Sequence, residues 1–412
     1  MVAEYLPGNR LTLLNSGEAY FPALLAAISS AKQEIYLESY IFADDEIGHE
    51  VATALCLAAA RGVRVNVTVD GFGARNFATD FMPRLTAAGV RAMQYRPEIG
   101  RFHLKRHRLR RLHRKLAVID ARVAYVGGIN VINDFNAPAD MCPRYDYAVQ
   151  LEGPGVGQVH HAVRRMWEIV SWANFKRRFR LAPPATPCCE KAGEQTAAFL
   201  IRDNIRHRND ILHAYIQAIA DAKNDILIAN AYFLPGVRFA RALRAAAKRG
   251  VRITILLQGK TDHPLLRFAT QALYAAALEI GIRIFEYEKS FMHAKVAVID
   301  GQWATVGSSN IDPFSLLLAK EANLVVRDAA FASELQASIQ TAMNAGAREM
   351  SLAELDKLPW HRRFMRWLSY GLVRVMVGIT GYGPKHWQSD EETPGATPMP
   401  AATSATEIAE SR

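Results

Sequence analysis

The sequence has few cysteines. Only four occur in 412 residues, and none of them has the Cys-x-x-Cys spacing. Cys188 and Cys189 are vicinal, a geometry that is awkward for an ordinary disulfide, and Cys56 and Cys142 each stand alone. This pattern excludes a disulfide-stapled secreted scaffold and a cysteine zinc site. A reducing compartment is the simplest expectation.

Long apolar runs are also missing. The N-terminus has no basic flank leading into an apolar stretch, so we expect no signal peptide. The stretch 368–383 is interrupted by Arg374 and four glycines, and it is shorter than the roughly 20 residues that a spanning helix needs. Arginines and tryptophans surround it, among them Trp360 and Trp367. This favours a segment at the membrane interface, and a C-terminal helix packed on the body is the alternative.

Positive charge, by contrast, is abundant and clustered. The formal net charge is +10, and the stretch 101–115 alone contains eight Lys or Arg residues and three His. Further clusters lie at 176–180 and 362–374. Such fields attract nucleic acid or the headgroups of an acidic membrane. A solvated face without a partner is the alternative for any single cluster.

The chain is built from two similar halves. Residues 31–37 match 222–228, and 61–65 match 249–253. This repeat is far longer than a solenoid unit, which indicates duplicated domains. Because short β-rich runs alternate with alanine-rich helical segments in each half, we predict a layered α/β fold made of two duplicated domains.

The domain boundary is predicted where three prolines interrupt the pattern, between 175 and 194. A tail rich in Ser, Thr, Ala, Pro and Glu begins near residue 388 and predicts disorder. The expected organisation is a first domain at 1–174, a linker at 175–195, a second domain at 196–345, a membrane-interfacial or packing segment at 346–387, and a disordered tail at 388–412.

The strongest signal is one motif that occurs twice. It reads His113-Arg-Lys115-Leu-Ala-Val-Ile-Asp120, and 180 residues later His293-Ala-Lys295-Val-Ala-Val-Ile-Asp300. We expect strands at 112–119 and 292–299, where the period of two places His and Lys of each copy on one face. Each Asp is followed by a turn and a second apolar run, which is a hairpin signal. The residues alone therefore favour turn and framework roles for both aspartates.

Each hairpin ends in small residues followed by an asparagine, Asn130 in the first copy and Asn310 in the second. Small residues let backbone N–H groups approach an oxyanion, and Ser308 and both asparagines can donate further hydrogen bonds. We predict that Asn130, Ser308 and Asn310 bind phosphate. An ordinary glycine-rich turn would be the preferred interpretation of either copy alone.

Two facing half-sites suit a phosphodiester. One His can attack phosphorus to give a phosphohistidine, while the other protonates the leaving alcohol and later deprotonates the incoming one. Lys115 and Lys295, together with both asparagines, would neutralise the phosphoryl oxygens, so we expect no metal and no cofactor. The sequence has no H-E-x-x-H pattern and no clustered carboxylates that would bind a metal.

An attacking imidazole needs a carboxylate on its second nitrogen. Asp146 follows His113 by 33 residues, and Glu321 follows His293 by 28, each at the start of a strand-like run. We therefore assign Asp146 to His113 and Glu321 to His293. Exposed strand-edge carboxylates are the alternative.

These residues resemble the phospholipase D superfamily, whose motif is His-x-Lys-x4-Asp followed by Gly-Ser-x-Asn. Glu38 in Leu-Glu-Ser-Tyr-Ile-Phe, Asp44-Asp45, Met-His-Ala-Lys and Leu-Glu-Gly-Pro at 151–154 look like bacterial cardiolipin synthases, over roughly 5–345. The chain is most similar to the shorter variety, which lacks an N-terminal pair of membrane spans. Two positions depart from that pattern: Gly128 stands where Ser is usual, and Ala319-Lys320 stand where Leu-Asn is commoner. The first departure predicts weaker hydrogen bonding in the first half-site.

The resemblance implies transfer of a phosphatidyl group between two phosphatidylglycerol molecules with release of glycerol, or to phosphatidylethanolamine or glycerol as acceptor. It implies that His113 is the nucleophile and His293 the acid and base, and it places Asp120 and Asp300 among the catalytic residues. It implies two duplicated α/β/α domains packed face to face with one shared active site. It also implies a peripheral protein at the cytoplasmic face of a bacterial cell membrane. A hydrolase of the phospholipase D type and a nuclease, for which the basic stretch 101–111 would bind DNA, are the alternatives; the apolar aromatic tail favours lipid and no nucleic acid.

Overall fold

The structure is a computed structural model. It describes residues 3–97, 111–174, 183–187, 190–203, 206–260, 264–312, 319–356, 364–365 and 367–371. Several predictions made from the sequence fall outside these residues. They concern nearly all of the basic stretch 101–111, the cluster at 176–180, the vicinal cysteines, most of the segment 346–387 beyond residue 356, and the tail 388–412.

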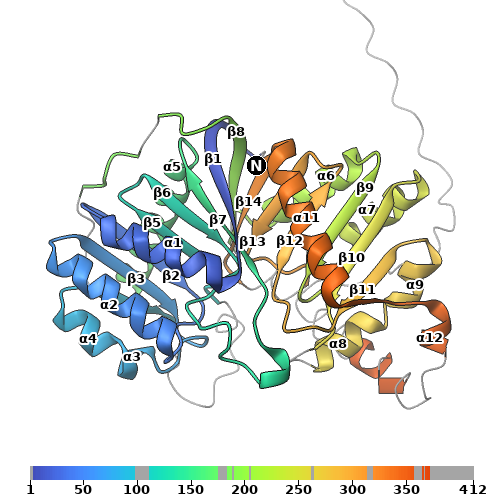
Figure 1. Cartoon of the computed structure of the whole chain (residues 1–412), viewed down its shortest axis with the longest axis horizontal. Helices are drawn as coiled ribbons and strands as arrows, with labels where there is room; N and C mark the ends of the chain where they lie inside the picture. Colours follow the sequence, from blue (N-terminus) through green and yellow to red (C-terminus); the bar gives the residue numbers. More distant parts are fainter. Residues whose placement is uncertain are drawn as a thin grey trace, which may run out of the picture.

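The first repeat occupies the blue to green half of Figure 1 and alternates strands with helices. Its strands are β1 (Leu6–Asn15), β2 (Glu34–Ser39), β3 (Arg64–Asp70), β4 (Arg91–Tyr95), β5 (Lys115–Ile119), β6 (Val123–Gly127) and β7 (Tyr147–Glu152). Its helices are α1 (Ser16–Ser30), α2 (Glu46–Ala60), α3 (Phe77–Asp80), α4 (Met82–Ala87) and α5 (Val156–Ala173).

The second repeat follows the same order and occupies the yellow to orange half of Figure 1. Its strands are β8 (Gln195–Arg202), β9 (Asp225–Asn230), β10 (Arg252–Gln258), β11 (Arg283–Tyr287), β12 (Lys295–Ile299), β13 (Trp303–Gly307), β14 (Glu321–Arg327) and β15 (Ala347–Glu349). Its helices are α6 (Asp210–Asp221), α7 (Val237–Lys248), α8 (Pro264–Gln271), α9 (Tyr274–Glu279), α11 (Ala329–Gly346) and α12 (Leu352–Asp356).

Repeated glycines explain why the two halves turn at the same places. Gly62 and Gly250 follow α2 and α7 with φ of +89° and +86°, the left-handed conformation that ends a helix without a Cβ penalty. The next residue closes the cap, because Val63 N donates to Ala58 O at 3.1 Å and Val251 N donates to Ala246 O at 3.1 Å. The repeated Arg-Gly-Val of the sequence is therefore a helix stop followed directly by a buried strand.

The strands form one sheet of 15 strands in the order β15-β11-β10-β9-β12-β13-β14-β8-β1-β7-β6-β5-β2-β3-β4. The outer strands β2, β3 and β4 pair in parallel, as do β9, β10 and β11, whereas the central strands pair antiparallel. The halves join where β1 pairs with β8, at the centre of Figure 1. The sequence did not predict this junction.

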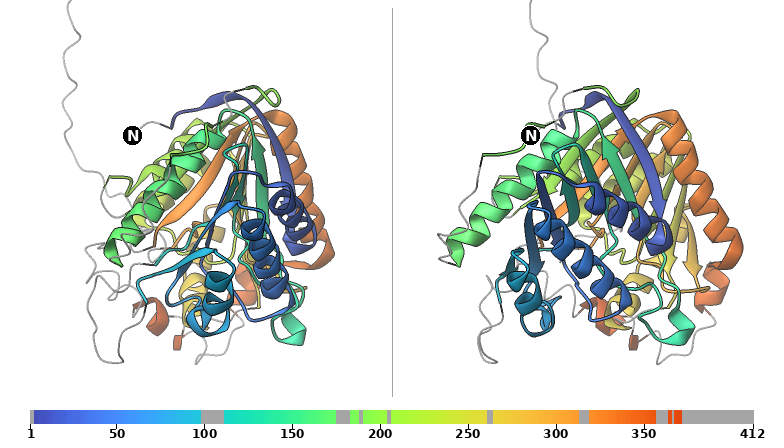
Figure 2. Two further views of the ribbon diagram at one scale, coloured as in Figure 1. Left: turned by 90° about the vertical axis from the view of Figure 1, so that its left-hand side faces the viewer. Right: turned by 60° about the vertical axis from the view of Figure 1, so that its left-hand side comes forward.

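Three apolar layers fill the molecule. One core cluster lies under α1, α2 and α4 of the first repeat, and an equivalent one lies under α6, α7 and α9 of the second. The third cluster takes residues from both repeats and from α5 and α11, which lie on opposite sides of the central strands in the left view of Figure 2. The predicted α/β fold of two duplicated domains packed face to face is confirmed.

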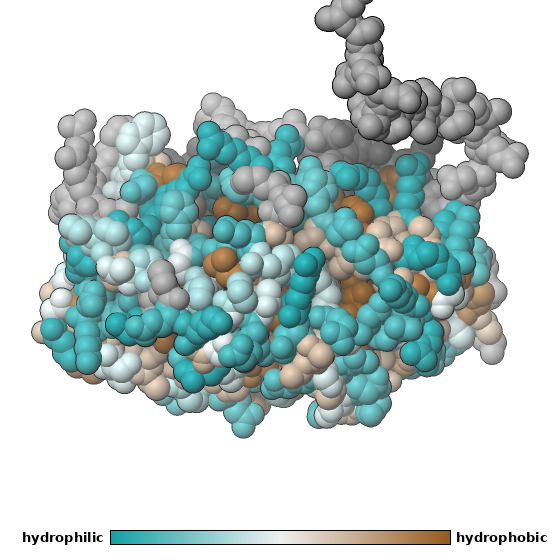
Figure 3. All heavy atoms as spheres, turned by 90° about the horizontal axis from the view of Figure 1, so that it is seen from above, coloured by the Kyte–Doolittle hydropathy of each residue, from teal (hydrophilic) through white to brown (hydrophobic). Residues whose placement is uncertain are grey.

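The described surface shows no extended apolar belt in the view from above, where hydrophilic residues dominate and apolar ones are scattered (Figure 3). None of the described helices combines the length and the apolarity that a membrane-spanning segment requires.

Candidate active site

Both motif histidines lie just before a hairpin, at the boundary between the repeats. The strands begin at Lys115 and Lys295, three residues later than the sequence predicted. Each histidine is fixed by the opposite repeat: His113 N donates to Lys320 O at 2.9 Å, and His293 N donates to Tyr145 O at 2.7 Å. The repeats therefore position each other's motif through the backbone.

The carboxylate partners are exchanged between the repeats. His113 Nδ1 lies 3.1 Å from Glu321 Oε2, and His293 Nδ1 lies 2.7 Å from Asp146 Oδ2. The sequence assigned Asp146 to His113 and Glu321 to His293, and this pairing is wrong. Bridges between the repeats, Leu112 with Lys320 and Tyr145 with Met292, bring each carboxylate beside the other repeat's histidine.

The carboxylates fix the tautomer of both rings. A proton on Nδ1 can be donated to the carboxylate, which leaves Nε2 with its lone pair. Burial lowers the pKa of His293 to about 3, and the nearby Lys295 ammonium contributes in the same direction. Burial likewise lowers the pKa of His113, and Glu321 opposes this shift. Both imidazoles are therefore neutral near pH 7 in the free protein.

The two lysines lie behind the histidines and are almost completely buried. Lys115 Nζ donates to His113 O at 2.7 Å, and Lys295 Nζ donates to Asp146 Oδ2 at 3.1 Å. Burial lowers the pKa of Lys115 to about 7 and also lowers that of Lys295. Burial alone would raise the pKa of Asp146, but Lys295 and His293 outweigh it and hold this pKa below its usual value.

Both histidines open into one cavity of about 220 Å³. Asn130 and Asn310 line it, so the structure brings together both histidines and both predicted phosphate-binding asparagines. Asn130 Oδ1 accepts the N–H of Ile41 at 3.0 Å, which leaves its amide N–H groups as donors. A cavity of this size with two imidazoles and two amides can hold a phosphodiester.

Ser308 is not at the cavity surface. Its side chain is fully buried, and its Oγ donates to Glu321 Oε2 at 2.5 Å. The prediction that Ser308 binds phosphate is therefore corrected: this hydroxyl holds the carboxylate that orients His113.

Gly128, the counterpart of Ser308, faces the other carboxylate. A Cβ added at Gly128 would lie 2.3 Å from Asp146 Oδ1, so a serine does not fit without displacing Asp146. In that half Lys295 donates to Asp146 in place of a hydroxyl. Because the carboxylates are exchanged, the glycine affects His293 of the second motif, whereas the sequence predicted weaker hydrogen bonding in the first half-site.

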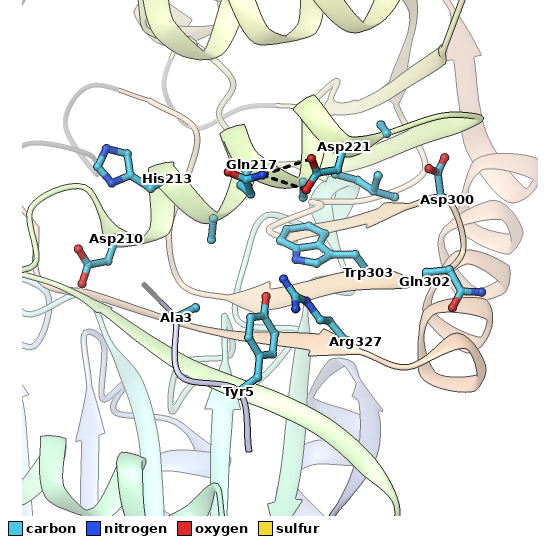
Figure 4. Close-up of a pocket in the computed structure, with 14 residues that line it drawn as sticks. Ala3, Tyr5, Asp210, His213, Gln217, Asp221, Asp300, Gln302, Trp303 and Arg327 are labelled. Carbon is cyan, nitrogen blue, oxygen red and sulfur yellow. Dashed lines mark hydrogen bonds between the residues drawn. The ribbon is translucent and has the colours of Figure 1, made fainter. Parts of the chain in front are cut away.

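The motif aspartates lie at the far ends of β5 and β12. Asp120 accepts the backbone N–H groups of Lys32, Gln33 and Glu34 at 2.7–2.9 Å, and Asp300 accepts those of Lys223, Asn224 and Asp225 at 2.7–2.9 Å. Figure 4 shows Asp300 at the end of its strand, in a surface groove with Trp303 and Gln302, and neither His113 nor His293 lines this groove. The framework role expected from the residues holds, and the catalytic role implied by the resemblance is corrected.

Tyr40, Asp134 and Arg144 are among the cavity residues that the sequence missed. The ring of Tyr40 meets His113 edge-on, with centroids 4.8 Å apart, and lies 5.4 Å from Lys115 Nζ. Asp134 and Arg144 line the cavity, and burial raises the pKa of Asp134 to about 6. Tyr40 follows the strand β2 by one residue and could have been found there. Asp134 and Arg144 come from a loop without a motif.

Among the described residues, no three His, Cys, Asp or Glu side chains lie close enough together to hold a metal ion. The hydrogen-bond donors that line the cavity include the side chains of Asn130, Asn310 and Arg144.

Comparisons with known proteins identify the family of this chain. A family model described as "Cardiolipin synthase, PLD-like domain" matches residues 24–137 and 215–343. The chain is 36% identical over 396 residues to cardiolipin synthase B of Escherichia coli K12, covering 94% of this chain and 93% of that protein. It is 31% identical over 369 residues to cardiolipin synthase A of Proteus mirabilis, covering 88% and 75%. A phosphatidylserine synthase structure from Haemophilus influenzae Rd KW20 superposes with a TM-score of 0.67 at 13% identity, covering 92% and 96%, which shows the fold alone.

Proposed function

Since this chain belongs to the phospholipase D-like family of cardiolipin synthases, we propose that it is a phosphatidyltransferase that makes cardiolipin. The donor is phosphatidylglycerol, and the acceptor is the glycerol hydroxyl of a second phosphatidylglycerol. The observation that carries this proposal is the shared cavity, into which two neutral imidazoles open, each held on Nδ1 by a carboxylate of the opposite repeat.

In the first step, His113 Nε2 attacks the phosphorus of the donor. A P–N bond forms, the P–O bond to the glycerol headgroup breaks, and His293 gives its Nε2 proton to the departing oxygen. The free protein holds His293 neutral, so His293 takes up this proton from water when the anionic donor binds. The negative charge of the bound phosphodiester favours protonation of His293, because an anion close to an imidazole stabilises its charged form.

In the second step, His293 takes the proton of the incoming hydroxyl. The hydroxyl oxygen attacks phosphorus, and the P–N bond to His113 breaks. Asn130 and Asn310 donate to the phosphoryl oxygens, and the buried ammoniums of Lys115 and Lys295 supply positive charge behind them. These groups carry out the charge neutralisation that a metal performs elsewhere, so the proposed reaction is metal-independent.

The test is incubation of the purified protein with labelled phosphatidylglycerol in mixed micelles. Cardiolipin and free glycerol in equal amounts are expected, also in the presence of a chelator. Phosphatidic acid as the only product would replace the transferase by a hydrolase. Cleavage of single-stranded or duplex DNA, with no lipid product, would support the nuclease alternative.

The roles of the two histidines can be separated with a phosphatidyl ester of p-nitrophenol, whose departure needs no acid. His293→Asn should still release one burst of nitrophenol and accumulate a phosphohistidine that is labile in acid, whereas His113→Asn should give no burst. The reverse outcome would exchange the two roles. Full activity in both variants would contradict the mechanism.

The proposed site of action is the cytoplasmic face of a bacterial cell membrane, where the protein binds peripherally. Phe364 and Trp367 are 50% and 69% exposed, and Leu368 is 44% exposed, whereas Tyr370 of the same short stretch packs on the second repeat's core. One side of this stretch is thus anchored to the body, and the other presents aromatics that suit a lipid interface. Phe364→Ser/Trp367→Ser should lower flotation with anionic liposomes, whereas Leu57→Ser, an exposed apolar position on α2, should not.

A further inference from the structure

A second cavity, of about 510 Å³, lies between α5, β8 and the start of β14. It shares no lining residue with the active cavity. Arg114, Arg165, Arg202 and Lys320 contribute its cationic groups, and Met166, Ile169 and Phe199 contribute apolar surface. It is therefore both cationic and apolar, and the proposed reaction does not use it.

Two of these cations form no direct ion pair with a described residue, although the charges of Asp203 and Glu38 act on Lys320 from a longer distance. The side chains of Lys320 and Arg165 make no hydrogen bond or ion pair with any described residue, although Lys320 is partly buried. Arg114 is different, because Glu38 neutralises it with contacts of 2.8 and 2.6 Å. Arg96, whose charge acts on Lys320, has a buried Nη1 without a partner among the described residues. Burial and the charges of Arg114 and Arg96 lower the pKa of Lys320 to about 8 and outweigh the opposing effect of Asp203 and Glu38, and a bound anion would stabilise the ammonium.

The acidic residues that line this cavity are engaged elsewhere. Asp203 accepts the N–H of His207 at 2.9 Å, and Asp210 holds the His207 ring at 2.8 Å. Glu4 lies near Gln158, at 3.5 Å. None of these carboxylates forms an ion pair with Lys320 or Arg165 among the described residues.

Helix α5 continues the cavity with an apolar stripe. Arg165, Ile169 and Trp172 are spaced four and three residues apart, so they lie on one face of the helix. Ile169 is 42% exposed and Trp172 is 83% exposed, and the right view of Figure 2 shows the end of α5 extending beyond the sheet. A cation followed by an apolar ridge matches the order of groups in a phospholipid, phosphate first and acyl chain next.

We propose that this cavity is a second binding site for one anionic phospholipid, with the phosphate at Lys320 and Arg165 and the acyl chain along Ile169 and Trp172. The site lies directly behind the reaction centre. The carbonyl of Lys320 accepts the N–H of His113, and the next residue, Glu321, holds the His113 ring.

Calorimetric titration with dihexanoylphosphatidic acid below its micelle concentration tests this site, since that lipid has no headgroup alcohol to transfer. We expect binding that is at least tenfold weaker in Lys320→Gln and in Arg165→Gln, as for the loss of a charge-assisted hydrogen bond. Arg241→Gln, which removes an exposed charge on α7, is the matched control and should bind like the unaltered protein. Arg165 is exposed, so Arg165→Gln should fold like the unaltered protein. It therefore tests the site even if Lys320→Gln folds poorly.

Two further arms identify the ligand and separate it from the active cavity. Ile169→Ser should weaken binding of the lipid but not of inorganic phosphate. The double variant His113→Ala/His293→Ala should bind the lipid as tightly as the unaltered protein, whether or not the proposed transfer reaction is correct. Inorganic phosphate bound as tightly as the lipid, or equal losses in Arg241→Gln, would overturn the proposal.

Discussion

Glu321 of the second repeat holds the ring of His113 of the first, with 3.1 Å between Oε2 and Nδ1. Asp146 of the first repeat holds His293 of the second at 2.7 Å. Neither repeat therefore contains a histidine with its own carboxylate. The two repeats share one active centre, because each supplies the carboxylate that orients the histidine of the other. Both repeats must therefore pack against each other before either imidazole is oriented.

The exchanged pairing predicts which step each carboxylate serves. With the p-nitrophenyl substrate, Glu321→Gln should slow the burst, because it disturbs His113. Asp146→Asn should leave the rate of the burst unchanged and slow turnover, because it disturbs His293. Each variant should lose roughly 100- to 10,000-fold in its own step, the range for a positioned proton-transfer group.

Glu286→Gln is the control for this comparison, since Glu286 is an equally buried carboxylate that binds Tyr274 and Gln271 away from the cavity. It should change neither step by more than a few-fold. If Asp146→Asn instead abolished the burst, the pairing in the structure would not be the one used in the reaction.

Substitution of Gly128, at the end of the first hairpin, should lower both the reaction rate and the stability. Gly128→Ala places a Cβ 2.3 Å from Asp146 Oδ1, so it should slow turnover and lower the free energy of unfolding by about 1–3 kcal/mol, as overpacking of a core does. Gly157→Ala on α5 is the control, because its Cβ would meet its nearest neighbour at 3.5 Å and alanine favours a helix. Urea denaturation with parallel rate measurements checks both, and an unimpaired Gly128→Ala would contradict the tight contact with Asp146.

Local pattern was sufficient to predict much of this protein. The spacing of two between His113 and Lys115 predicted a common face, although the strand begins only at Lys115. The Asp-turn pattern predicted the framework role of Asp120. Both depend only on strand periodicity and hairpin geometry, which act within a few residues.

The partners of the histidines could not be predicted in the same way. Asp146 is nearer in sequence to His113, but the contact is decided by the bridge of Tyr145 to Met292 across the repeats. Such pairing depends on how two complete sheets pack, and a single sequence carries no local sign of it. Ser308 was misassigned for a different reason: it follows β13, which pairs with β14 of the same repeat, and its hydroxyl donates to Glu321 at the start of β14.

The motif aspartates should matter for stability and little for chemistry. Asp120→Ala removes the acceptor of three backbone N–H groups and places alanine at a φ of +52°, so the free energy of unfolding should fall by about 1–3 kcal/mol. The rate per folded molecule should stay within a few-fold. Asp221→Ala, which removes an exposed carboxylate at the end of α6, is the control. A thousandfold loss of rate at unchanged stability would restore a catalytic role for Asp120.

The pH dependence of the reaction should report Lys115. Burial lowers its pKa to about 7, so its ammonium is lost as the pH rises through neutrality. The histidine pKa values lie below their usual range and titrate on the acid side of the profile. If the ammonium stabilises the phosphoryl oxygens, kcat/KM, which reports the free enzyme, should fall about tenfold for each unit above pH 7. Lys115→Arg should lower the overall rate but remove this alkaline limb, because a guanidinium stays charged. Lys248→Arg, at the end of α7, should keep the limb, and its persistence in Lys115→Arg would exclude Lys115 as the titrating group.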